Sequence, residues 1–245
     1  MSLLRVQGNF MTIWDRIQRL TRPLASCVTS LLNRGEDWLW EQRLGIHTTR
    51  SAPSPHEDAH RYGYVAYDTY LRIFNALKLT ASDVVVDLGC GKGRIVCTAA
   101  CYPIAAALGV EIDPALYREA QVNIEQMRWA RAPRRVECIS ATEFDYDEVT
   151  VAILFHPFGK ETWRKVLDRI EASLVRNPRS FRIVYINPEY LDVLVERPWL
   201  KFEKQWTPGP WSRLKFPIVF YRALAGVVSD DSSRNTESDT IFANS

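Results

Sequence analysis

Short apolar runs alternate with amphipathic stretches through the middle of the chain. Continuous runs that are mostly β-branched or small and apolar predict strands buried on both faces of a parallel sheet. Apolar residues three and four positions apart predict the helices between them. The expected strands are residues 84–88, 106–111, 136–140, 151–155 and 181–186, and the expected helices are 64–77, 95–101, 115–128 and 161–174. Repeated strand–helix units predict a doubly wound, mostly parallel α/β sheet with helices on both faces.

Two further strand-like segments, residues 202–206 and 218–222, follow the fifth predicted strand. Prolines and Trp211 lie between them, and no helical pattern fits there. We therefore expect a C-terminal antiparallel hairpin that completes a seven-stranded sheet. After about Gly226 the chain is rich in Ser, Asp, Thr and Asn, which predicts a disordered tail over residues 226–245.

The N-terminal region has a different pattern from the sheet. Apolar residues at helical spacing predict an amphipathic helix over about the first 45 residues: Phe10, Ile13, Trp14, Ile17 and Leu20. This helix either packs on the domain as an extension, which we favour, or docks on a membrane or a partner. Residues 47–62 are expected to form a loop in which His47, His56 and His60 are solvated, because no cysteine or carboxylate completes a metal-ligand spacing. The predicted organisation is an extension and loop over 1–61, and a domain over 62–225.

Composition narrows the functional classes. The formal net charge of +2 lacks the basic excess of a strong nucleic-acid binder. The five cysteines are odd in number and contain no Cys-x-x-Cys pair, which argues against a zinc site or a disulfide framework and for a reducing compartment. No apolar run reaches the length of a membrane span, so we expect a soluble, cytoplasmic protein without a metal site.

The most informative motif directly follows the first predicted strand. It is Asp87-Leu88-Gly89-Cys90-Gly91-Lys92-Gly93-Arg94. Dinucleotide-binding loops have the spacing Gly-x-Gly-x-x-Gly/Ala, in which a small third residue lets the helix approach a pyrophosphate. That spacing requires a small residue at position 94, where this chain has arginine. Instead the three glycines lie two positions apart, and Asp87 stands two positions before the first.

This Asp/Glu-x-Gly-x-Gly-x-Gly pattern resembles the class I S-adenosylmethionine-dependent methyltransferases of the seven-strand type, over about residues 62–222. The resemblance implies a Rossmann-like fold in which the glycines pass beneath the methionine part of S-adenosyl-L-methionine. It also implies that Glu111, at the end of the second strand, accepts the ribose hydroxyls and that Ile112 packs on adenine. The implied cofactor-binding residues are Asp87, Gly89, Cys90, Gly91, Gly93, Glu111, Ile112 and Ala141.

Two positions depart from the family pattern. Many relatives end the third strand with Asp or Asn at the adenine amino group, where this chain has Ser140-Ala141-Thr142, so that a hydroxyl or the backbone would take that contact. After the fourth strand, amine- and amide-methylating relatives carry Asn/Asp-Pro-Pro-Tyr/Phe, where this chain has His156-Pro157-Phe158. His156 and Phe158 are our catalytic candidates. His156 has three open roles: a general base, a group that positions the acceptor, or a structural residue.

Two flanking segments also resemble family features. Asn187-Pro188-Glu189-Tyr190 resembles Asn-Pro-x-Tyr but follows the fifth strand, and we expect it to be a strand-to-helix turn with Asn187 as N-cap and Pro188 at the first helical position. Residues 62–67 resemble the segment before the glycine loop in seven-strand lysine methyltransferases, including the histone-modifying type. There the segment closes over the cofactor with aromatic side chains. Tyr64 and Tyr67 are therefore expected, with Phe158, to form aromatic walls of the site.

The sequence predicts a methyltransferase that uses S-adenosyl-L-methionine on a protein side chain or a small molecule in preference to nucleic acid. One alternative is a non-catalytic cofactor-binding or interaction module on the same fold. A nicotinamide-dependent oxidoreductase is a second alternative, against which the glycine spacing and Arg94 argue. The identity of the acceptor and the oligomeric state stay open.

Overall fold

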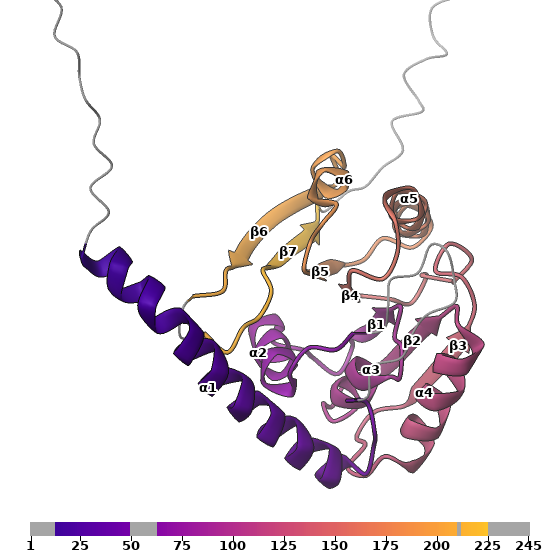
Figure 1. Cartoon of the computed structure of the whole chain (residues 1–245). Helices are drawn as coiled ribbons and strands as arrows, with labels where there is room; N and C mark the ends of the chain where they lie inside the picture. The colour runs from indigo at the N-terminus through magenta and orange to yellow at the C-terminus, as the bar shows by residue number, and fades with distance from the viewer. Residues whose placement is uncertain (1–12, 50–62, 210–211, 225–245) are drawn as a thin grey trace, which may run out of the picture.

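A computed structural model describes residues 13–49, 63–209 and 212–224, and its side chains from Ala25 onward. Figure 1 shows the elements in chain order. They are α1 (Ile13–Leu44), α2 (Tyr67–Leu77), β1 (Val84–Leu88), α3 (Arg94–Ala99), β2 (Ala106–Glu111), α4 (Pro114–Gln126), β3 (Arg134–Cys138), β4 (Val151–Phe155), α5 (Lys160–Arg176), β5 (Arg182–Ile186), α6 (Leu191–Val195), β6 (Leu200–Trp206) and β7 (Ile218–Ala223).

The strands form one seven-stranded sheet in the order β3-β2-β1-β4-β5-β7-β6. Strands β3, β2, β1, β4 and β5 are parallel, whereas β7 is antiparallel to both β5 and β6. The predicted Rossmann-like, mostly parallel sheet with a C-terminal antiparallel hairpin is thus confirmed. The pattern did not predict the order of the last two strands: β7 lies between β5 and β6, so that β6 is the edge strand. Strand order reverses between β1 and β4, which is where ligands bind in open α/β sheets.

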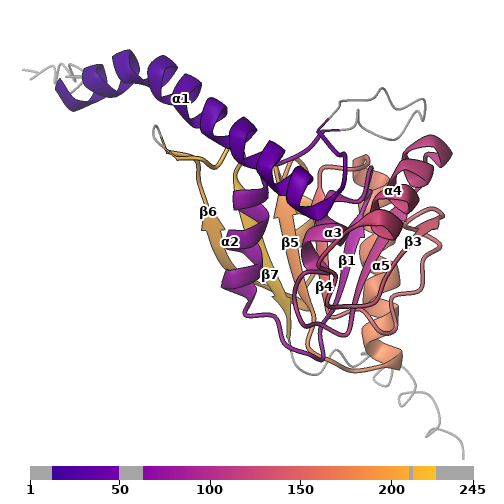
Figure 2. The same cartoon turned by 90° about the horizontal axis from the view of Figure 1, so that it is seen from below.

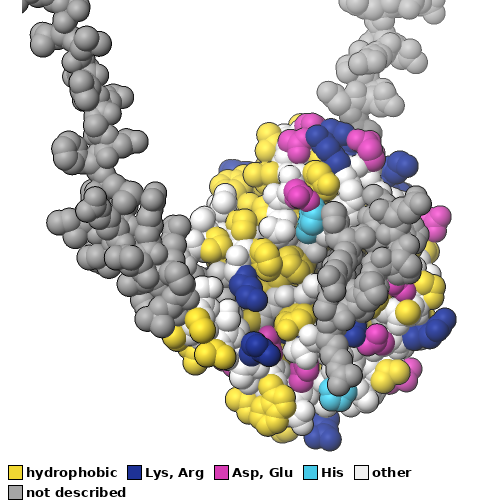
Figure 3. All heavy atoms as spheres, viewed as in Figure 1, with side chains coloured by type: hydrophobic (Ala, Val, Ile, Leu, Met, Phe, Trp, Pro, Cys, Tyr) yellow, Lys and Arg dark blue, Asp and Glu magenta, His cyan; other side chains and the backbone are white. Residues whose placement is uncertain are grey.

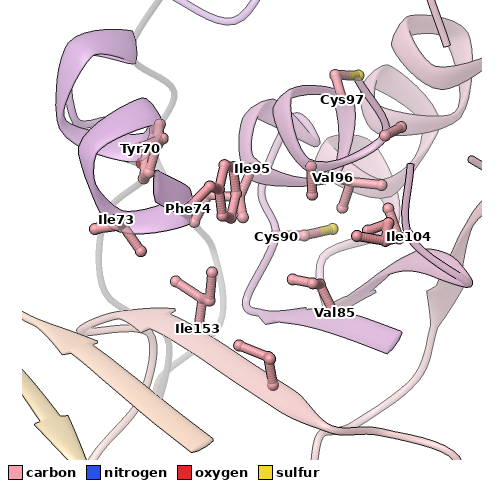
Figure 4. Packing of buried hydrophobic residues seen from close by; sticks show 14 of the residues in the cluster. Tyr70, Ile73, Phe74, Val85, Cys90, Ile95, Val96, Cys97, Ile104 and Ile153 are labelled. Carbon is pink, nitrogen blue, oxygen red and sulfur yellow. The ribbon is translucent and has the colours of Figure 1, made fainter. Parts of the chain in front are cut away.

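Side chains of the strands alternate between two hydrophobic cores. Val85 and Ile153 pack with α2, α3 and α4 on one face, as the close view in Figure 4 shows for residues such as Phe74 and Ile95. Val86 and Leu154 pack with α5 and α6 on the other face. Because helices cover both faces, β1, β2 and β4 are buried almost throughout, which explains their continuous apolar runs.

Several predicted boundaries differ from the structure by one to three residues, and tertiary contacts explain two of these differences. Helix α2 begins at Tyr67 instead of residue 64, where the carboxylate of Asp37 from α1 accepts the first helical N–H at 2.9 Å. Strand β3 runs from Arg134, which pairs with Ala107, to Cys138. It therefore begins two residues earlier than predicted, and Ser140 lies beyond its end. Each boundary depends on a residue distant in the sequence.

Helix α1 packs on the domain, which confirms the favoured interpretation for the residues whose side chains are described. Figure 2 shows the helix crossing α2 and continuing at its N-terminal end past the edge of the sheet. His47 is exposed, as expected. Other predictions fall outside the described residues: those on Phe10, on the side chains of Ile13, Trp14, Ile17 and Leu20, on His56 and His60, on Trp211 and on the tail.

Among the helices that the structure describes, none is long and apolar enough to cross a membrane. Every described cysteine is unpaired. Cys97 is buried, and Cys101 is half-buried with its thiol 3.4 Å from the Cys97 carbonyl oxygen. The domain boundaries at residues 61 and 225 lie in or beside undescribed segments and remain predictions.

Candidate active site

A cavity of about 290 Å³ opens at the carboxyl ends of β1, β2 and β4, beside the turn after β3. This volume is at the lower end of the range for small-molecule sites. Among the residues that line the cavity are Asp87, Gly89, Cys90, Gly91, Glu111, Ile112, Ala141, His156 and Phe158. The structure therefore brings together every predicted site residue except Gly93, which does not line the cavity.

The glycine loop is held tightly against its neighbours. The N–H groups of Gly89 and Cys90 both donate to the Val110 carbonyl oxygen at 2.9 Å, which joins the loop to β2. Gly89 has a φ of +74°, and a Cβ atom there would overlap the ring of Pro157. Glycine at this position therefore permits direct contact between the loop after β1 and the loop after β4.

Gly93 has a packing role instead of the predicted contact with the cavity. Gly93 directly precedes the first residue of α3 and has a φ of +78°, in the left-handed region that favours glycine. A Cβ atom there would lie 3.4 Å from the Cβ of Ala120. Close approach of α3 to α4 is what a small residue at this position allows. The neighbouring Lys92 is buried and forms an ion pair with Glu119 at 2.8 Å.

Two buried carboxylates define the electrostatics of the cavity. Glu111 accepts the Gly91 N–H at 2.7 Å and the Asp113 N–H at 2.9 Å. Burial raises the pKa of Glu111, although these backbone donors oppose the rise. Burial, and then repulsion from Glu111, raise the pKa of Asp87 well above its ordinary range. Within the described residues Asp87 has no ion pair, so this half of the cavity suits a cationic ligand group.

Arg94 carries a function that the sequence pattern did not predict. Its guanidinium is buried and forms ion pairs with Asp37 and Glu41 of α1, each at 3.2 Å. The same guanidinium lies between the rings of Tyr64 and Tyr67, at 4.4 and 4.2 Å from their centroids. A signal existed in the spacing of the two acids, which lie four residues apart on one helix face. Arg94 thus ties α1 to the helix that follows the glycine loop.

The predicted aromatic walls need one correction. Tyr64 and Phe158 line the cavity, but Tyr67 does not. Its ring is buried against Arg94, and its hydroxyl lies 3.5 Å from the Thr48 hydroxyl. Tyr70, one helical turn further along α2, lines the cavity in its place. The apolar stripe identified the correct face of α2. Its member Tyr67, however, packs against the Arg94 guanidinium instead of lining the cavity.

The turn after β3 borders the cavity with small polar groups. Ser140 and Thr142 both line it, and their hydroxyl oxygens are 2.8 Å apart in a hydrogen bond. Ala141 lies between them and is buried. On the same side Ile112, Leu116 and Ile139 contribute apolar surface.

His156 stands at the end of β4 in an uncommon backbone conformation. Its φ is +44°, in the left-handed region. Its Nδ1 lies 3.3 Å from the Tyr185 hydroxyl, and its Nε2 contacts the carboxylate of Glu189. Burial raises the pKa of Tyr185 to about 12, so that hydroxyl is protonated at neutral pH. Protein groups thus engage both ring nitrogens.

The turn after β5 differs from the prediction. Asn187 is not an N-cap: α6 begins at Leu191, with Tyr190 at the cap position. Asn187 has a φ of +53° and its N–H donates to the Pro217 carbonyl oxygen at 2.8 Å. This turn carries Glu189 to His156, a contact that sequence reasoning missed. The only signal for it was the resemblance to Asn-Pro-x-Tyr.

Comparisons with known proteins agree with this geometry. A family model described as a methyltransferase domain matches residues 85–177. A protein-lysine N-methyltransferase from Saccharolobus islandicus is 38% identical over 87 residues, which cover 34% of this chain and 52% of that protein. The chain thus spans about half the length of this curated relative.

Solved structures support the same fold. An RNA methyltransferase from Salinibacter ruber, in complex with S-adenosyl-L-homocysteine, has a TM-score of 0.50 and 18% identity, covering 69% of this chain and 98% of its own. An S-adenosylmethionine-dependent O-methyltransferase from Thermotoga maritima has a TM-score of 0.50 and 16% identity, covering 68% of each chain. Residues 85–177 thus match a methyltransferase domain, and the fold around them is the one that these two methyltransferase structures have.

Proposed function

We propose that this protein transfers the methyl group of S-adenosylmethionine to a protein side chain or a small molecule. One observation carries the proposal: Asp87 and Glu111 are buried at the ends of adjacent strands, with the glycine loop between them, on one cavity. S-adenosylmethionine presents a cationic amine at one end of its tail and ribose hydroxyls beyond the sulfonium. Carboxylates bind both kinds of group through charge-assisted hydrogen bonds.

The residues present fit this cofactor. Asp87 lacks an ion pair within the described residues and would hold the amine. Each carboxylate oxygen of Glu111 has a second lone pair, so it would accept ribose hydroxyls while it keeps its bonds to Gly91 and Asp113. The apolar side chains of Ile112 and Ala141 would face the base. The bound cofactor supplies an already activated methyl group, so the protein's task is to position the acceptor and exclude water.

On the acceptor side, the contacts of His156 favour a positioning role. A neutral imidazole has one nitrogen that accepts a proton, and here Tyr185 and Glu189 engage both nitrogens. His156 would therefore hold the loop that presents Phe158 and Pro157 to the cavity. Phe158 would form an apolar wall beside the reacting atoms, backed by the Trp163 ring at 6.0 Å.

Two observations support the acceptor class. The curated relative from S. islandicus is a protein-lysine N-methyltransferase, which supports a protein side chain as the acceptor. The net charge of +2 does not favour binding to a polyanion. His156 stands where amine- and amide-methylating relatives carry Asn or Asp, and this departure weakens the case for a nucleic-acid N-methylase.

Calorimetry with S-adenosylmethionine and S-adenosylhomocysteine tests the first step, and binding of both is expected. Absence of binding at millimolar cofactor concentration would refute the proposal. The acceptor is tested by incubating the purified protein and labelled cofactor with a cell lysate. Label is expected in material that a protease degrades or in the small-molecule fraction. Label that only a nuclease releases would refute the acceptor class and leave the methyl donor in place.

A further inference from the structure

Helix α1 presents an unusual face to the domain. Its buried residues Asn33, Asp37 and Glu41 are polar and lie four positions apart. Each finds partners across the interface: Asn33 exchanges hydrogen bonds with Arg213, and the two acids pair with Arg94. These three polar side chains thus have partners within the protein.

The opposite side of α1 is apolar and exposed. We call it the outer face, and it consists of Val28, Leu31, Leu32, Trp38 and Leu39. Leu31, Trp38 and Leu39 are 62%, 60% and 59% exposed. Figure 3 shows hydrophobic side chains along the lower left edge of the molecule, which α1 follows in Figure 1. Five large apolar side chains exposed on one side of a helix are typical of an interaction site.

The charges beside the outer face are cationic. Arg34 and Arg43 are exposed, whereas Asp37 and Glu41 are buried with Arg94 and Glu36 pairs with Arg213. Asp37 and Glu41 are therefore turned toward the domain, Glu36 is paired with Arg213, and the exposed charges beside the outer face are those of Arg34 and Arg43.

Trp129 extends the same surface beyond the helix. It is 66% exposed, and its ring centroid lies 5.5 Å from the Arg43 guanidinium carbon. Its φ of +67° is rare for a bulky residue, and such a conformation persists where the surrounding structure enforces it. Tryptophan and arginine side by side are typical of the boundary between lipid chains and headgroups.

We propose that the outer face of α1 docks on an anionic lipid surface. The leucines and Trp38 enter the boundary region of the bilayer, and Arg34 and Arg43 contact lipid phosphates. Charge decides against a second copy of this chain, because two outer faces would bring like charges together with no acidic partner on the described part of either face. This inference stands independently of the proposed methyl transfer.

Co-sedimentation of the full chain with vesicles tests the proposal. Vesicles of phosphatidylcholine with phosphatidylglycerol should bind the protein, pure phosphatidylcholine should bind it far less, and added salt should weaken the binding. The double variant Leu31→Gln/Trp38→Gln should bind anionic vesicles at least about tenfold more weakly, because apolar insertion is lost. Val195→Gln on α6 is the matched control, since Val195 is 70% exposed outside α1, and it should bind as the unaltered protein does.

Three results would overturn the proposal. The first is no binding to anionic vesicles. The second is an equal loss of binding in Val195→Gln and in the double variant. The third is a dimer, detected by light scattering without lipid, that Leu31→Gln disperses, which would assign the outer face to a second copy. Circular dichroism and cofactor calorimetry on each variant check that the domain is folded. Cofactor binding should be unchanged in all of them, because none of the substituted residues lines the cavity.

Discussion

The two halves of the cavity are built in different ways. In the half that we propose binds the cofactor, the cofactor half at the ends of β1 and β2, hydrogen bonds of the backbone hold the site: the N–H groups of Gly89 and Cys90 donate to the Val110 carbonyl oxygen, and the Gly91 N–H donates to the Glu111 carboxylate. In the acceptor half, at the ends of β4 and β5, two non-glycine residues, His156 and Asn187, are left-handed. There the site depends on side chains of separate turns that meet.

This difference teaches which half tolerates change. The cofactor half is held mainly by backbone groups placed by strands buried on both faces, and its geometry depends on a few identities, notably Gly89 and the carboxylate of Glu111. The acceptor half rests on one histidine held by Tyr185 and Glu189. Uncommon backbone conformations cluster at functional sites, which supports a role for this half in choosing the acceptor.

The largest expected effect concerns the support of the cofactor half. Arg94→Met would leave Asp37 and Glu41 buried without their cation, and removal of one partner from a buried pair costs about 3–5 kcal/mol. Urea unfolding should register that loss in the free energy of unfolding. Arg72→Met, which breaks an exposed pair with Asp68, is the control and should cost less than about 1 kcal/mol. Equal losses in both variants would contradict the role given to Arg94.

The next effect concerns Glu111. Glu111→Ala removes the proposed ribose ligand and also the acceptor of two backbone N–H groups, so cofactor affinity should fall about 100-fold, or about 2.8 kcal/mol. Calorimetry measures it. Glu125→Ala, an exposed acid on α4, should leave the affinity unchanged. An unchanged cofactor affinity in Glu111→Ala would contradict the proposed role of Glu111 as the ribose ligand.

Asp87→Asn should separate binding from stability. Cofactor affinity should fall about tenfold, because the amide lacks the charge that attracts the amine. The cofactor-free protein should melt about 2–4 °C higher, since about 1 kcal/mol of repulsion and desolvation is relieved. Calorimetry and thermal unfolding measure the two effects, and a lower melting temperature would contradict the unpaired state of Asp87.

The pH dependence of stability follows from the same group. Folding raises the pKa of Asp87 above its ordinary value of 3.8, so the native state binds a proton that the unfolded chain has released. Its contribution to stability therefore declines as pH rises from 3.8 through the raised pKa, and the loss persists above it. The difference in stability between Asp87→Asn and the unaltered protein should grow with pH across that range, as unfolding curves at several pH values would measure.

The smallest effect on cofactor binding is expected in the acceptor half. His156→Asn should change cofactor affinity by less than about threefold, or about 0.7 kcal/mol, because its contacts are to Tyr185 and Glu189. The rate of methyl transfer should nevertheless fall, and Glu189→Gln should lower it in the same direction by releasing the imidazole. A loss of cofactor affinity in His156→Asn as large as that in Glu111→Ala would erase the distinction between the halves.

Prediction succeeded where the determinants are local in sequence. Strands β1, β2 and β4 begin and end where the apolar runs predicted, because burial on both faces demands a continuous run. It failed at Asn187, whose N–H donates to the Pro217 carbonyl oxygen thirty residues away, and it did not identify Ala120, on another helix, as the neighbour of Gly93. Periodicity contains no information on such partners.

By itself the sequence determined the alternation of strands and helices and the spacing of the glycine loop with its two acids, because each depends on residues close together in the chain. Only the tertiary structure decided that Arg94 joins α1 to the site, that Glu189 reaches His156, and which face of α1 stays exposed. The physical reason is burial. A charge costs little in water and much in a core, whereas an apolar face is unfavourable in water and favourable in a core, and only the packed fold decides which environment each one meets.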